Sequence, residues 1–200
     1  MFVRVTSAFV LLLLAAGGAG TQQQTLRVTG IVDSFDGQVL TIKSEKLGEV
    51  KVGLTADATV FGVAEAKLAD IKPGAYIGVG AMPQPDGSQR ALQVTILAES
   101  QRGLSEGHRP WDARPNSTMT NGTVDQTVAG VEGHVLTVKY KDGEKKIVVP
   151  PDAVVLAYVA GDKNELKPGA RIAIVRALKK ADGALETNRV NVGRGKVVPQ

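Results

Sequence analysis

The sequence predicts an all-β protein made of two tandem small Greek-key β-barrels, OB-like or of related topology, that follow a signal peptide. Three observations lead to this prediction. Apolar and polar residues alternate over short segments, Asp-Gly and Lys-Pro-Gly turns separate these segments, and most of the chain after residue 20 is present twice. Alternation with a period of two is typical of strands that bury one face.

Residues 1–20 predict a signal peptide. Arg4 supplies a basic start, an apolar run covers residues 8–16, and Gly18-Ala19-Gly20 offers small residues to a peptidase. The apolar run is shorter than the roughly 20 residues that span a bilayer. We therefore expect cleavage after Gly20 and a periplasmic or secreted protein. An uncleaved membrane anchor is the alternative.

The two copies occupy residues 21–100 and 122–200. Gly37–Lys43 matches Gly133–Lys139 at an offset of 96, and Leu68–Gly74 matches Asn164–Gly169 at an offset of 95. We expect one barrel from residues 21–100, a second barrel from residues 122–200, and an ordered connecting segment at residues 101–121. A single sandwich formed jointly by both copies is the alternative.

The first half of each copy reads as strands joined by tight turns. Alternation predicts strands at residues 26–33 and 50–54 in the first copy and at residues 136–140 in the second. A tight hairpin needs residues that tolerate positive φ, which Asp-Gly dipeptides supply. At least four hairpins are therefore expected, at Asp36-Gly37, Asp86-Gly87, Asp142-Gly143 and Asp182-Gly183.

The second half of each copy begins with the only segments where a short helix fits, at residues 63–70 and 160–166. Lys72-Pro73-Gly74 and Lys167-Pro168-Gly169 then suit type II turns, each of which starts a strand. Strands this short cannot bury both faces of an open sheet. Closure into a small barrel is therefore expected.

The composition excludes several classes of protein. Of the 200 residues 43% are hydrophobic and 22% are charged, which excludes wholesale disorder, collagen-like repeats and a polytopic membrane protein. The chain contains no cysteine, which excludes disulfides, iron–sulfur clusters and a cysteine nucleophile. The formal net charge is +4, and the lysines of the basic second copy flank turns, where such residues are usually solvated.

Residues 101–121 depart from the repeat and hold the only tryptophan and one of the two histidines. A flexible linker does not normally contain Trp, whose large ring favours burial, so we expect this segment to dock. The candidate ligand or partner surface is His108, Arg109, Trp111, Asp112 and Arg114. The alternative is a structural role, in which Trp111 plugs the seam between the barrels and the charged residues pair across it.

The sequence predicts no cofactor, no metal site and no catalytic residue. His108 and His134 are the only imidazoles, and neither a His-x-x-His spacing nor an Asp-x-Asp-x-Asp-Gly loop occurs. The motifs of serine hydrolases, zinc proteases and nucleotide-binding loops are absent. We do not expect nucleic-acid binding, because most of the few aromatic residues lie in predicted strands and an exported chain meets little nucleic acid.

Several segments resemble a known family. His-Arg-Pro-Trp-Asp at residues 108–112 and Pro-Asn-Ser-Thr-Met-Thr-Asn at residues 115–121, together with residues 30–37 and 81–87, are similar to a group of uncharacterised exported proteobacterial proteins. That group is related to a bacterial domain of unknown function built from small β-barrel repeats. The resemblance implies the tandem fold and a periplasmic location, and it carries no catalytic residue. Some members are labelled metal transporter permease components, a role that needs several spanning helices, whereas this chain has one apolar segment.

The sequence thus predicts a non-enzymatic periplasmic binding or interaction protein, with a small ligand or an envelope protein as its partner. Two alternatives remain open. One is a structural envelope component that adds strands to partners through exposed edges. The other is a soluble metal-handling accessory protein.

Overall fold

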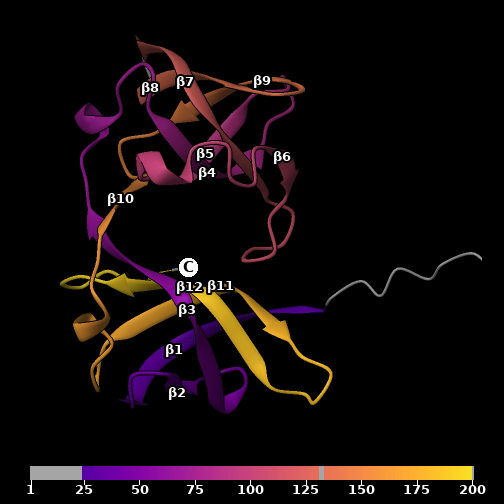
Figure 1. Cartoon of the computed structure of the whole chain (residues 1–200). Helices are drawn as coiled ribbons and strands as arrows, with labels where there is room; N and C mark the ends of the chain where they lie inside the picture. The colour runs from indigo at the N-terminus through magenta and orange to yellow at the C-terminus, as the bar shows by residue number, and fades with distance from the viewer. Residues whose placement is uncertain (1–23, 131–132, 200) are drawn as a thin grey trace, which may run out of the picture.

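The computed structural model describes residues 24–130 and 133–199, and these residues form an all-β fold (Figure 1). The predicted signal peptide lies outside the described residues. Within them, no helix has the length and apolar character needed to cross a membrane. The prediction of small closed β-barrels is confirmed by the sheet order.

The described residues contain twelve strands and three 3₁₀ helices of three residues each. In chain order these are β1 (Thr25–Phe35), β2 (Val39–Ser44), β3 (Gly48–Glu65), η1 (Leu68–Asp70), β4 (Tyr76–Pro83), β5 (Gln89–Ile96), η2 (Glu99–Gln101), β6 (Gly107–Pro110), β7 (Thr118–Gly130), β8 (Gly133–Tyr140), β9 (Gly143–Val149), β10 (Val154–Ala160), η3 (Lys163–Glu165), β11 (Arg171–Lys179) and β12 (Leu185–Gly193).

The first barrel combines strands from the two ends of the chain, and we call it the terminal barrel. Its sheet runs β12-β11-β1-β2-β3, and β12 also pairs with β3 in parallel, which closes the ring. Figure 1 shows it as the lower body of indigo and yellow strands. Its core consists of branched aliphatic side chains, including Val28, Ile42, Val52, Ile174 and Val190, which suit a pleated and half-buried surface.

The second barrel, which we call the central barrel, is the upper body in Figure 1. Its sheet runs β5-β4-β7-β8-β9, and β5 closes the ring through a parallel pairing with β9. Ile77, Val94, Val124, Leu136 and Ile147 lie at the centre of its core. Strand β10 pairs in parallel with the C-terminal half of β5.

Each barrel therefore takes three strands from one copy and two from the other. The terminal barrel joins β1–β3 of the first copy to β11 and β12 of the second, and the central barrel joins β7–β9 of the second copy to β4 and β5 of the first. This differs from the expectation of one barrel from residues 21–100 and another from residues 122–200. The physical reason is that β3 continues for 18 residues, past an irregularity in its pairing with β12, and carries the rest of the first copy to the other barrel.

The exchange of strands between the copies follows the same residue pairing in both barrels. Tyr76 pairs with Thr123 in the central barrel, and the equivalent residues Arg171 and Ile31 pair in the terminal barrel. The Pro-Gly turns dock in the same way: Gly74 N–H donates to the Val124 carbonyl at 2.7 Å, and Gly169 N–H donates to the Val32 carbonyl at 2.9 Å. The turn of each copy is thus fixed to the first strand of the other.

Close backbone approach repeats in both barrels as well. A Cβ on Gly30 would lie 2.3 Å from the Lys43 carbonyl oxygen, and a Cβ on the equivalent Gly122 would lie 2.4 Å from the Lys139 carbonyl oxygen. Only glycine fits these positions, where the backbone of the first strand of each copy closely approaches that of the second. The first and second strands of each copy therefore pack against each other in the same way in both barrels.

The predicted turns are present. Each of the four Asp-Gly dipeptides lies between two antiparallel strands, and Gly74 and Gly169 have φ values of +84° and +88°. The two expected helices are single turns, η1 and η3, because β3 and β10 extend to residues 65 and 160 and leave little chain before each Pro-Gly turn. The third short helix, η2, was not expected.

Candidate functional site

The segment between the copies is ordered and covers one side of the central barrel. It begins at η2 and continues to β6, whose four residues pair with Thr118–Asn121 of β7. The predicted segment of residues 101–121 therefore overlaps β7, which begins at Thr118 and also pairs with β4. Residues 111–117 form the loop between β6 and β7.

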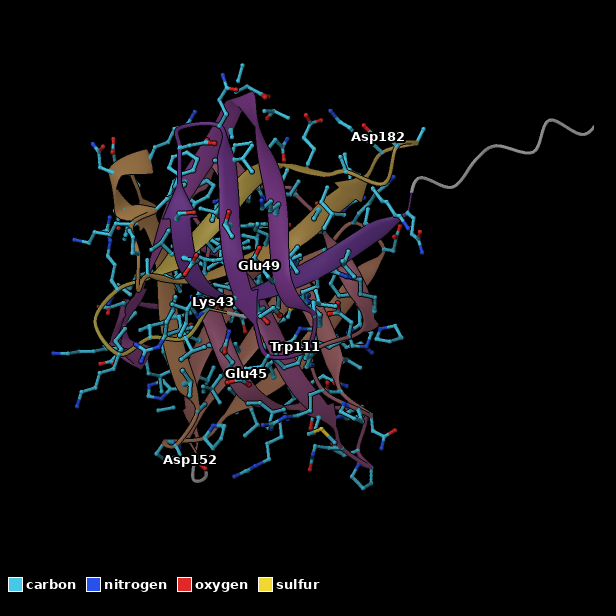
Figure 2. All side chains as sticks on the ribbon, turned by 90° about the horizontal axis from the view of Figure 1, so that it is seen from below. Lys43, Glu45, Glu49, Trp111, Asp152 and Asp182 are labelled. Atoms are coloured by element: carbon cyan, nitrogen blue, oxygen red, sulfur yellow. The ribbon has the colours of Figure 1, made fainter. Side chains whose placement is uncertain are left out.

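Trp111 lies flat against a glycine of β4. A Cβ on Gly80 would be 2.4 Å from Cζ3 and 2.7 Å from Cη2 of the indole, so the ring occupies the space that any other side chain would fill. The backbone N–H of Trp111 donates to the Ser117 carbonyl at 2.9 Å, which closes the β6–β7 loop. In Figure 2 Trp111 lies within the outline of the molecule, whereas Asp152 and Asp182 lie at its periphery.

A depression of about 280 Å³ opens beside the indole. Three segments line it: the β6–β7 loop supplies Trp111 and Arg114, β5 supplies Arg90 and Gln93, and the start of β10 with the residues before it supplies Asp152 and Val154.

The lining of this depression combines apolar surface with positive charge. Val154 is 51% exposed although it is a large aliphatic residue. The lining contains two arginines, Arg90 and Arg114, and one acidic residue, Asp152. Among the described residues the Arg114 side chain has no hydrogen-bond or ion-pair partner. A planar cation next to an aromatic edge suits an anionic group attached to an apolar or ring-shaped body.

Asp112 connects the two barrels. Its two carboxylate oxygens accept hydrogen bonds from Nε and Nη2 of Arg27 in β1 at 3.0 and 2.8 Å. These hydrogen bonds hold the pKa of Asp112 below its usual range, against the opposing effect of partial burial. Asp112 therefore pairs across the seam between the barrels, as the structural alternative for this segment expected. Neither Arg109 nor Arg114 has an ion-pair partner there among the described residues.

His108 and Arg109 lie along β6 and do not line the depression. His108 Nδ1 is 2.8 Å from Thr120 Oγ1, and partial burial, with a smaller effect of Lys145, lowers the pKa of the ring. Arg109 Nη1 donates to the Ser105 carbonyl at 2.8 Å. Of the five predicted site residues, only Trp111 and Arg114 meet at the depression.

Sequence reasoning missed the residues that the repeat itself contributes. Arg90, Gln93, Asp152 and Val154 lie in or next to strands, where a charged residue is most simply interpreted as solvated. One signal was available. Gly78 and Gly80 interrupt an otherwise apolar strand, and a glycine in that setting often marks the close approach of another group.

The described residues contain no group of three or more His, Asp or Glu side chains placed to hold a metal ion. No family model, curated protein or solved structure matches this chain. The description of the site therefore depends on its own geometry.

Proposed function

We propose that this chain is a non-enzymatic, exported binding protein whose ligand occupies the depression beside Trp111. The observation that carries the proposal is the seating of the indole on Gly80, which fixes an aromatic ring in a depression that Arg114 also lines. A rigid aromatic group next to an unpaired cation is a common way to build a small-molecule site. Export is supported by the features of residues 1–20.

The ligand class follows from the lining. The apolar part of the ligand packs against Trp111 and the exposed face of Val154. Its anionic group pairs with Arg114, because a guanidinium fork matches a carboxylate or phosphate in two hydrogen bonds. Asp152 at the rim accepts hydrogen bonds from hydroxyl groups. A small sugar or aromatic ring that carries a carboxylate or phosphate satisfies all three requirements.

The test is a fluorescence titration. Trp111 is the only tryptophan of the chain, so its emission reports on this site alone. We expect glucuronate, glucose 6-phosphate or benzoate to change the emission in a saturable manner. Arg114→Gln should weaken that binding at least tenfold, since a charge-assisted hydrogen bond is worth about 1.5–3 kcal/mol.

Arg109→Gln is the matched control, because Arg109 lies on the same segment but outside the depression. It should leave the titration unchanged. Two results would overturn the proposal: no probe alters the emission, or the two variants weaken binding equally.

A further inference from the structure

Arg189 of β12 is a partly buried cation without a counter-charge. Its guanidinium lies over the Phe61 ring, 5.5 Å from the centroid. The Nε atom is covered and has no hydrogen-bond partner, and no carboxylate of the described residues pairs with the side chain. Only Nε is covered in this way, so the two terminal nitrogens reach solvent. Burial lowers the pKa of Arg189, and the nearby Tyr158 acts in the opposite direction.

Asn191, two residues further along the same face of β12, is also incompletely satisfied. It is only 1% exposed. Its Nδ2 donates to the Tyr158 hydroxyl at 3.1 Å, whereas its Oδ1 has no partner. A buried polar atom without a hydrogen bond destabilises the folded state by about 1–3 kcal/mol. Two such atoms next to each other are unusual in a stable core.

The fold does not require a charge at this place. The equivalent residues of the first copy are Gln93 and Thr95, at an offset of 96. They have the same parallel pairing, with β10 in place of β3. Gln93 Nε2 donates to Thr95 Oγ1 at 3.1 Å, so this neutral pair satisfies itself. The hydrogen bond to Tyr158 accounts for Asn191, whereas barrel packing alone does not account for the charge of Arg189.

This pair lies at the seam between the barrels. Figure 1 shows β11 and β12 on the side of the terminal barrel that faces β4 and β5. Arg27, held by Asp112 from the other barrel, lies close enough to act with Arg189 on the Tyr158 hydroxyl. Asp112 neutralises Arg27, whereas Arg189 has no carboxylate partner among the described residues.

We infer that Arg189 binds an oxyanion, the carboxylate or phosphate group of a small ligand, through its two terminal nitrogens at the seam between the barrels. The planar fork of arginine matches two oxygens of such a group. A functional group that is kept at a cost to stability is the expected signature of a binding site. This site is independent of the depression beside Trp111.

The internal repeat supplies the test variant. Arg189→Gln combined with Asn191→Thr places the satisfied pair of the first copy into β12. The change also removes the hydrogen bond from Asn191 to the Tyr158 hydroxyl, so every midpoint is compared with that of the same protein without anion. Inorganic phosphate or acetate should then raise the melting temperature of the wild type in a saturable manner, because a ligand of the native state stabilises it by mass action.

The double variant should lose that shift, while Arg176→Gln, a change in an exposed arginine of β11, should keep it. Sodium chloride holds the ionic strength constant, so general screening is the same in every sample. A shift with phosphate alone identifies a phosphate group, and a shift with acetate alone identifies a carboxylate. Arg189→Lys, which keeps the charge but not the fork, should weaken the response at least tenfold.

Two results would overturn the inference: neither anion shifts the wild-type midpoint, or the double variant responds like the wild type. If the double variant fails to fold, the Arg189→Lys comparison decides the question. The titration with Trp111 reports on the other site. If no probe binds in that titration, the outcome of the melting experiment with phosphate and acetate still decides the inference about Arg189.

Discussion

Val63 of β3 and Tyr158 of β10 face each other in the antiparallel pair that links the barrels, and they are the same position of the two copies, 95 residues apart. A position that pairs with its own counterpart lies on the axis of an internal twofold. The neighbouring pair Gly62–Val159 is related in the same way to Ala64–Ala157. The copies are thus intertwined around this point, and Asn191, which donates to Tyr158, lies with Arg189 beside it.

Replacement of Gly80 by alanine should displace Trp111. The new Cβ would lie 2.4 Å from the indole, so the ring must leave its seat and become more exposed. We expect a red shift of the emission and a loss of about 1–3 kcal/mol in the free energy of unfolding, the usual cost of overpacking. Fluorescence and denaturant unfolding measure the two effects.

Gly53→Ala is the matched control for that change, because a Cβ there meets only the Leu185 carbonyl oxygen at an ordinary 3.6 Å. It should leave the emission maximum unchanged. An unshifted maximum in Gly80→Ala would contradict the position assigned to the ring.

His108 should make the protein less stable in mild acid. Burial, helped by Lys145, holds the folded pKa below the ordinary value of 6.5, so the unfolded chain takes up the proton first as the pH falls. Stability is therefore unaffected by this group above about pH 6.5 and decreases as the pH falls from there towards the lowered pKa. His108→Asn should flatten that part of the pH profile of the unfolding free energy.

His134→Asn serves as the comparison, since it removes the only other histidine. The loss of stability should persist in that variant. If both variants have the same pH profile as the wild type, the environment assigned to His108 is wrong.

Local signals predicted much of the fold. Asp36-Gly37 and Asp182-Gly183 specify their hairpins by themselves, because the backbone of a tight turn selects the residues that tolerate it. The identity of the partner strand could not be predicted in this way. Ile31 and Thr123 are equivalent, and both are compatible in principle with the strand that follows either Pro-Gly turn. Which of the two strands becomes the partner depends on the course of β3 through residues 55–59, where the sequence has no glycine or proline to mark a turn.

The candidate site could be predicted only in part. The departure from the repeat singled out Trp111 and Arg114, both of which line the depression. Residues within the repeat gave no such signal. Arg189 in particular is indistinguishable in sequence from a solvated strand residue, and its significance depends on the burial of Nε and on the missing counter-charge.

The most direct test of the exchanged architecture is a disulfide between strands, which the absence of native cysteine makes unambiguous. Ile31 and Arg171 are directly opposite in β1 and β11, at a Cα separation that suits a disulfide. The exchanged fold predicts rapid intramolecular oxidation of Ile31→Cys with Arg171→Cys, and none of Thr123→Cys with Arg171→Cys. Oxidation of the second pair and not the first would show that each copy closes its own barrel and would contradict the account.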